Sequence, residues 1–318
     1  MKNVAILTSG GDSQGMNAYI SKLVGLLVKN KINVYGIKRG FQGLLDEDFI
    51  KLNLKNVENI SFLGGSVLKT ARCTEFYEDK GVEKGFNILK NHKIDCLVVL
   101  GGNGSFKGAL NLIDKGMNVI CIPGTIDNDL FYSDISLGFD TAVNNAVDTI
   151  EKIKQTMLSN NRGIIVEVMG RNCGNIALNT ALSVNANALI INEDKKSIKN
   201  AENYVKNAIL NGVESPLIVL QENIMDGQKL ADKFQKKFKK QFKFEHIGYI
   251  QRGGEPTVKD KIFANLLAIQ TMNSILKGEF NIAIGMQKES IFNIPLKEAL
   301  TKESNFNKNL YELYLSNL

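Results

Sequence analysis

The chain has 318 residues, of which 44% are hydrophobic and 23% are charged, and its formal net charge is +6. This composition excludes an intrinsically disordered protein, because disordered chains have too few hydrophobic residues to bury a core. A length above about 250–300 residues favours two lobes over a single core. No apolar run reaches the roughly 18 residues of a membrane span, and the chain opens on a strand pattern without a signal peptide. We therefore expect a cytoplasmic protein without a membrane partner.

The cysteines show no pattern of a structural cross-link. The four cysteines lie far apart with no paired spacing, which argues against a disulfide framework and against a zinc site. Cys96 and Cys121 fall in apolar strand patterns and are most simply core thiols.

Short β-branched runs alternate with longer helical patterns along the chain. The candidate strands are residues 4–7, 34–37, 96–100, 119–122, 163–169, 189–191 and 217–220. The candidate helices are residues 16–28, 82–91, 106–114, 140–157, 176–184 and 197–210. This alternation predicts an α/β fold with mainly parallel sheets covered by helices on both faces. Two lobes would be joined by short crossings near residues 137–140 and 250–254.

Two glycine-rich turns follow two of these strands, at residues 8–16 and 101–105. Glycines let the backbone approach a phosphate, and N–H groups at the start of the next helix supply donors. Neither turn has the Walker or the Rossmann glycine spacing. Each alone is as often a tight strand-to-helix turn. The two would converge on one crevice if their strands are neighbours.

A third turn, Pro123 to Asp129, also follows an apolar strand. Its aspartates, Asp127 and Asp129, could be a general base and a Mg²⁺ ligand, or turn and helix-capping carboxylates. Phosphoryl transfer needs a base for the acceptor hydroxyl and cations around the transferring group. The two glycine turns and several arginines favour that chemistry over capping; these arginines are Arg72, Arg162, Arg171 and Arg252.

Six lysines lie between residues 233 and 243, interleaved with Phe234, Phe238 and Phe242. Lysines with phenylalanines could bind nucleic acid through phosphate contacts and base stacking. Phenylalanines four residues apart are more typical of the buried stripe of an amphipathic helix. We therefore expect a helix with a solvated lysine face and no nucleic-acid partner.

The motifs together resemble the bacterial ATP-dependent 6-phosphofructokinases along nearly the whole chain. The matching segments are residues 7–12, 15–17, 101–105, 123–129, 166–171, 173–174 and 251–254. The resemblance implies a glycolytic enzyme that transfers the γ-phosphoryl group of ATP to the 1-hydroxyl of fructose 6-phosphate, with Mg²⁺. It assigns residues 1–138 and 251–304 to a nucleotide-binding lobe, and residues 139–250 and 305–318 to a sugar-phosphate-binding lobe.

The resemblance also implies the roles of particular residues. Asp127 would take the hydroxyl proton, Thr125 would position the transferring phosphate and Arg171 would balance developing charge. The positions that match ATP contacts are Gly11, Phe41, Arg72, Cys73, Gly102, Asn103, Gly104, Ser105 and Gly108. The positions that match sugar-phosphate contacts are Thr125, Asp127, Arg162, Met169, Gly170, Arg171, Glu222, Lys243, Tyr249 and Arg252.

Two of these positions imply an assembly, and two others imply the phosphoryl donor. Arg162 and Lys243 match residues that family members lend to a neighbouring subunit's site, so a homotetramer is implied. Gly104 and Gly124 match users of ATP, because pyrophosphate-using relatives resemble these motifs with Asp and Lys there instead.

The chain departs from the family pattern near the metal and near the sugar. Asn103 stands where the family has an aspartate that helps to hold Mg²⁺, which leaves Asp129 as the remaining candidate ligand. Losing a charge-assisted contact costs about 1.5–3 kcal/mol, so turnover would be slower without being abolished. Tyr249 replaces a histidine, and Lys243 replaces an arginine that could grip phosphate bidentately.

The regulatory positions depart further. Residues Ser21, Gly25 and Leu54 stand where regulated members have phosphate-binding arginines, and Asn187 replaces a glutamate. We expect weak or absent activation by ADP and inhibition by phosphoenolpyruvate.

Three interpretations of the sequence are open. The chain is a working 6-phosphofructokinase, a non-catalytic phosphofructokinase-like subunit that regulates a partner, or a kinase for another acceptor such as NAD or a lipid. The altered residues Asn103, Lys243 and Tyr249 support the second, and the segments 123–129 and 251–254 disfavour the third.

Overall fold

The computed structural model describes residues 1–301 and 306–318. The chain divides into two compact units, Met1–Thr141 with Gly254–Asn305, and Ala142–Gly253 with Phe306–Leu318. We call them unit 1 and unit 2. The domain boundary expected between residues 304 and 305 lies outside the described residues.

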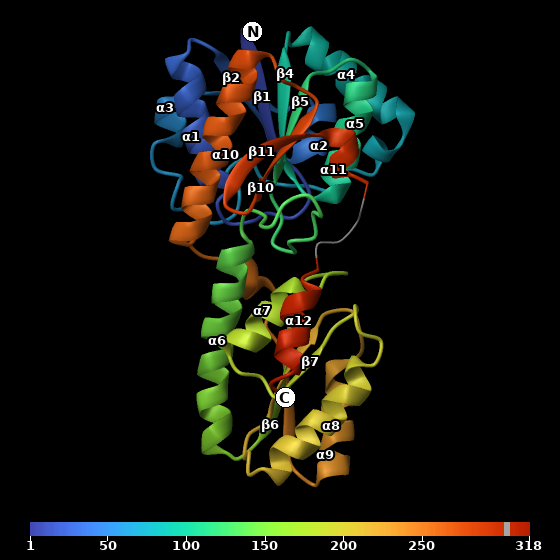
Figure 1. The fold of residues 1–318 in the computed structure, drawn as a ribbon. Coiled ribbons are helices and arrows are strands. Elements are labelled where there is room, and N and C mark those ends of the chain that lie inside the picture. The colour runs from blue at the N-terminus through green and yellow to red at the C-terminus, as the bar shows by residue number, and fades with distance from the viewer. Residues whose placement is uncertain (302–305) are drawn as a thin grey trace. The chain divides into compact units, whose positions relative to one another are not determined.

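Unit 1 is built on a seven-stranded sheet with the strand order β11-β10-β5-β4-β1-β2-β3 (Figure 1). Its strands are β1 (Asn3–Thr8), β2 (Asn33–Ile37), β3 (Phe49–Leu52), β4 (Cys96–Gly101), β5 (Val119–Pro123), β10 (Ile282–Gln287) and β11 (Ser290–Pro295). The five central strands run parallel, and β3 and β11 pair antiparallel at the two edges. The parallel sheet that the alternating pattern predicts is therefore confirmed.

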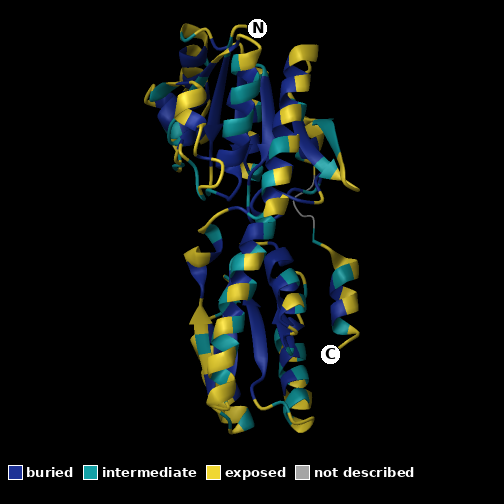
Figure 2. Ribbon diagram, turned by 90° about the vertical axis from the view of Figure 1, so that its left-hand side faces the viewer, coloured by how far each residue is buried: buried dark blue, intermediate teal, exposed yellow. Residues whose placement is uncertain are grey.

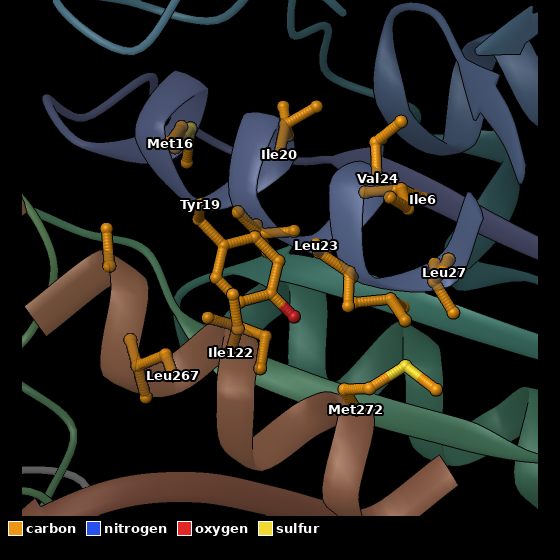
Figure 3. Close-up of a cluster of buried hydrophobic side chains, with 14 of the residues drawn as sticks. Ile6, Met16, Tyr19, Ile20, Leu23, Val24, Leu27, Ile122, Leu267 and Met272 are labelled. Carbon is orange, nitrogen blue, oxygen red and sulfur yellow. The ribbon is translucent and has the colours of Figure 1, made fainter. Parts of the chain in front are cut away.

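Helices cover both faces of this sheet. The helices of unit 1 are α1 (Met16–Lys29), α2 (Gly40–Leu45), α3 (Leu54–Val57), η1 (Glu75–Tyr77), α4 (Asp79–Asn91), α5 (Asn103–Asp114), α10 (Val258–Lys277) and α11 (Leu296–Ala299). One core lies between the sheet and helices α1 and α10 (Figure 3). At its centre Tyr19 is fully buried, and its hydroxyl group and that of Thr271 are 2.7 Å apart. A second core lies under α2, α4, α5 and α11.

Unit 2 contains a four-stranded parallel sheet in the order β7-β8-β6-β9. Its elements are α6 (Phe139–Ser159), which begins in unit 1, β6 (Gly163–Val168), α7 (Asn175–Ser183), β7 (Ala188–Ile190), α8 (Ser197–Leu210), β8 (Leu217–Gln221), α9 (Gly227–Phe238), β9 (Phe242–His246), η2 (Gly248–Arg252) and α12 (Lys308–Leu315). Helices α8 and α9 pack on one face of the sheet around Phe234. Figure 2 shows buried strands inside each unit and helices with one exposed face. No helix in the described part of the chain is long and apolar enough to cross a membrane.

The structure of the phenylalanine-rich segment corrects in part the prediction of one amphipathic helix there. Phe234 and Phe242 are buried and Phe238 packs against them, with ring centroids 5.4–6.1 Å apart, so the stripe belongs to the core. The expected helix does not continue to Phe242. Helix α9 stops at Lys239, whose φ of 50° is left-handed, and the chain enters strand β9. Alternation of apolar and polar residues over 242–246 is the strand signal that the four-residue spacing concealed.

Candidate functional site

Three turns of unit 1 meet because the strands that carry them are neighbours. Strands β1, β4 and β5 lie side by side and parallel, so their carboxyl ends share one edge of the sheet. The N–H of Ser9 donates to the Leu100 carbonyl at 2.9 Å, and that of Gly124 donates to the Gly101 carbonyl at 3.0 Å. The convergence that the sequence left conditional is therefore confirmed.

Glycine is required at position 101, where the first two turns touch. A Cβ at Gly101 would lie 2.5 Å from the Ser105 Oγ and 2.8 Å from the Ser9 carbonyl oxygen. A Cβ at Gly102 would lie 3.5 Å from the Thr125 Cβ. The backbone of the second turn thus passes within van der Waals contact of the other two.

Helix α5 begins at the second turn and presents its N-terminus at this edge. Its first three residues are Asn103, Gly104 and Ser105, and its N-cap is Gly102. Unpaired N–H groups and the positive end of the helix dipole favour an anion here. A Cβ at Gly104 would meet no atom within 4 Å, so space is open beside the helix start.

The remaining ATP-matching residues of unit 1 lie in three places. Phe41 is buried, stacks on Phe76 at 4.2 Å, and lies 3.1 Å from where a Cβ at Gly108 would be. Cys73 packs against the same core, and burial raises the pKa of its thiol. Arg72, by contrast, is exposed on the segment before η1. The first turn contributes Gly11.

The acidic turn keeps its functional side chains at the sheet edge. Asp127 is only 7% exposed, and its N–H donates to the Thr125 Oγ1 at 3.3 Å. The Asn103 Nδ2 lies 3.4 Å from an Asp129 carboxylate oxygen and 3.4 Å from the Asp129 carbonyl oxygen. The altered residue at position 103 therefore lies beside the other candidate metal ligand.

In unit 2, the sugar-matching residues gather beyond the carboxyl ends of β6, β8 and β9. The Glu222 Oε1 accepts from the N–H groups of Gly170 and Arg171 at 3.0 and 2.8 Å. The two residues that donate these N–H groups both have positive φ, 138° for Gly170 and 48° for Arg171. Glu222 thus fixes the strained turn that presents the exposed Arg171 side chain.

The residues after β9 belong to the same end of the sheet. Gln251 is fully buried, and its Oε1 accepts from the Met169 N–H at 3.2 Å. The Arg252 guanidinium lies over the Tyr249 ring, 5.6 Å from its centroid, within the range of a cation–π contact.

Arg162 and Lys243 do not join this group. Arg162 immediately precedes β6, and Lys243, on the neighbouring strand β9, pairs with Ile164 of β6. Both residues therefore lie at the amino end of the sheet. The six residues of β6 hold them roughly 20 Å from the Met169 end.

Several site residues were not found from the sequence. Gln251 was noted only as part of a motif, and the buried Ser136, whose hydroxyl donates to the Thr125 carbonyl at 2.6 Å, was not noted at all. A single buried serine has no sequence pattern of its own. The pair of His246 Nδ1 and Glu167 Oε1, 2.8 Å apart, could have been suspected only from the pairing of β6 with β9. Burial raises the pKa of the Glu167 carboxyl, against the lowering effect of His246.

The geometry is that of an α/β enzyme with glycine turns and an acidic turn at the carboxyl edge of a parallel sheet. A family model described as phosphofructokinase matches residues 3–275. The chain therefore belongs to the phosphofructokinase family.

Individual relatives agree with this assignment. The chain is 42% identical over 313 residues to an ATP-dependent 6-phosphofructokinase of Clostridioides difficile, and 41% identical to one of Alkaliphilus metalliredigens, each match covering 98% of both chains. A phosphofructokinase structure from Saccharomyces cerevisiae superposes with a TM-score of 0.90 at 26% identity, covering 99% of this chain and 50% of that one. A pyrophosphate-dependent phosphofructokinase from Marinobacter aquaeolei shares the fold, with a TM-score of 0.87 at 20% identity, covering 97% of this chain and 86% of that one.

Proposed function

We propose that the chain is an ATP-dependent 6-phosphofructokinase, which phosphorylates fructose 6-phosphate at its 1-hydroxyl to give fructose 1,6-bisphosphate and ADP. The observation that carries the proposal is the buried Asp127 on a turn that touches two phosphate-type glycine turns. Relatives at 42% and 41% identity bear that name. A non-catalytic role is not favoured by these relatives.

In the proposed mechanism, Asp127 accepts the proton of the 1-hydroxyl as that oxygen attacks the γ-phosphorus. Thr125 orients the transferring group, and Arg171 stabilises its equatorial oxygens. Met169, Glu222 and Arg252 hold the sugar phosphate. The open space at Gly104 supports ATP as the donor, because any side chain there would fill the space beside the α5 N-terminus.

Enzymes of this family are kinases that need a divalent metal, and we propose Mg²⁺. The described residues contain no group of three or more His, Cys, Asp or Glu side chains that could hold an ion. Asp129 and Asn103 still fit Mg²⁺, which takes one or two carboxylates together with substrate phosphate oxygens. The Asn103 amide would have to turn its oxygen to the ion, because its nitrogen now faces Asp129. When bound, the metal neutralises charge on the phosphates.

The proposal extends to assembly and location. Arg162 and Lys243, which lie at the opposite end of the unit 2 sheet from the other sugar-matching residues of that unit, would complete the site of another copy in a homotetramer. None of the four cysteines, all of which lie in the described part of the chain, forms a disulfide, as suits a reducing cytoplasm.

A coupled assay of ADP release with ATP, Mg²⁺ and fructose 6-phosphate tests the proposal. We expect the parent protein to turn over, and Asp127→Ala to lower kcat by about 10²–10⁴-fold because the general base is lost. The control is Asp232→Ala, on the exposed face of α9, which should match the parent. Absence of sugar-dependent ADP release by the parent would refute the proposed activity.

A further inference from the structure

The back of the acidic turn is held by one short segment, residues 136–141. Ser136 is fully buried, and its hydroxyl donates to the Thr125 carbonyl oxygen at 2.6 Å. The next N–H, that of Leu137, donates to the Pro123 carbonyl oxygen at 2.8 Å. Two consecutive residues therefore fix the backbone on both sides of Gly124.

The same segment packs on the first glycine turn. A Cβ at Gly138, where φ is 97°, would lie 2.6 Å from the Ser13 Cβ and 2.9 Å from the Gln14 nitrogen. A Cβ at Gly15 would lie 2.7 Å from the Leu137 Cδ1. Contact this close leaves no room for residues 136–141 and the first glycine turn to shift separately, because packed interiors deform little.

A buried carboxylate anchors the far end of the segment. Asp260, in the first turn of α10, is fully buried. Its Oδ1 accepts from the Gly138 N–H at 2.9 Å, and its Oδ2 accepts from the N–H and hydroxyl of Thr141 at 2.9 and 2.5 Å. Burial raises the pKa of this carboxyl, while the bonds from Thr141 and Gly138 act the other way. Burying a carboxylate is costly unless it is fully hydrogen-bonded, and three donors meet that need here.

We propose that Ser136 and Asp260 are positioning residues for phosphoryl transfer. They make residues 136–141 a bracket that sets the backbone of Thr125 and Asp127 against the first glycine turn. Misplacing a reacting group by about 1 Å can cost about 10²-fold in rate. Loosening the bracket therefore lowers kcat while substrate binding is retained.

The kinetic test rests on the proposed function and compares two buried serines. Ser136→Ala should lower kcat by about tenfold, with KM for both substrates within about twofold. Ser136→Thr keeps the hydroxyl donor and should restore kcat to within about threefold of the parent. The matched control is Ser197→Ala in unit 2, whose buried hydroxyl also donates to a backbone carbonyl, that of Ile191 at 3.1 Å. It should leave kcat at the parental value.

A second measurement does not need activity. Hydrogen exchange of the peptide covering residues 123–129 should be faster in Ser136→Ala than in the parent, and unchanged in Ser197→Ala. Parental kcat in Ser136→Ala, or an equal loss in the two alanine variants, overturns the positioning role. If the parent shows no turnover, the proposed function fails instead. In that case, a hydrogen-exchange rate at residues 123–129 that is the same in Ser136→Ala and the parent overturns the role of the bracket.

Discussion

The departure from the family pattern that bears most directly on the proposed metal site is Asn103, because its amide nitrogen lies 3.4 Å from a carboxylate oxygen of Asp129. Asn103→Asp would place two carboxylates side by side, which repel each other unless a cation lies between them. We expect the variant to have a lower melting temperature than the parent without metal, and to regain it with Mg²⁺ and ATP. We also expect about tenfold less Mg²⁺ at half-maximal activity, since a charge-assisted contact adds about 1.5–3 kcal/mol.

The control for this prediction is Asn103→Ala, which removes the amide and adds no charge. It should raise the Mg²⁺ requirement slightly and leave the metal-free melting temperature near that of the parent. Equal Mg²⁺ requirements in the parent and in Asn103→Asp would show that position 103 does not contact the ion.

Single positions also show why regulation is expected to be weak. Ser21 donates to the Val57 carbonyl at 2.8 Å, and the Asn187 Oδ1 accepts from the Leu217 N–H at 2.9 Å. Both side chains therefore have local structural partners in this chain. A Cβ at Gly25 would meet no atom within 4 Å, so that position offers no side chain to an effector.

At the scale of elements, the strands that the sequence identified are those with continuous apolar runs. All six residues of β4 are buried, and such runs are typical of parallel strands covered on both faces. Strands β3, β9, β10 and β11 were not identified. Strand β10 forms a hairpin with the adjacent β11, and it joins the parallel sheet through β5, about 160 positions earlier in the sequence. The adjacency of β1, β4 and β5 is equally a property of the whole sheet, which is why the convergence of their turns could be predicted only conditionally.

Helices α8 and α9 of unit 2 are joined by two salt bridges that share Glu202. Glu202 on α8 contacts both Lys233 and Lys237 on α9, and these lysines hold the pKa of its carboxyl below the ordinary range. A carboxyl with a depressed pKa stabilises the folded state above its unfolded pKa of about 4.3, and this stabilisation is lost as the pH falls through the folded value. Two of the six clustered lysines therefore have a structural role.

Glu202→Gln should consequently destabilise the protein by about 0.5–1 kcal/mol at neutral pH, because partly exposed ion pairs contribute little more. The difference from the parent should vanish at pH values well below 4.3, where Glu202 is protonated in both folded and unfolded chains. Chemical denaturation at several pH values measures it. Glu312→Gln, on the exposed side of α12, is the matched control and should show no such dependence. A loss of unfolding free energy in Glu202→Gln that is independent of pH would contradict a contribution from these salt bridges.

At the scale of the whole molecule, the positions of Arg162 and Arg252 in unit 2 bear on whether the proposed site draws on two chains. Arg162 lies at the amino end of β6 and Arg252 lies beyond the carboxyl end of its neighbour β9. If both contact the same sugar phosphate, they must belong to different copies. We expect Arg162→Ala and Arg252→Ala each to raise KM for fructose 6-phosphate by at least tenfold, because each removes a charged contact worth about 1.5–3 kcal/mol.

Mixing the two variants separates a shared site from a site within one chain. In an interface related by two-fold symmetry, a pair made of one Arg162→Ala chain and one Arg252→Ala chain contains one site with both changes and one with neither. Unfolding and refolding an equimolar mixture should therefore restore about a quarter of the parental activity at low sugar concentration. Each variant refolded alone serves as the control and should stay impaired. If the mixture is no more active than the controls, Arg162 and Arg252 do not bind one sugar phosphate from two chains. Arg162 must then act within its own unit. Its buried Nε has no hydrogen-bond partner in the described part of the chain.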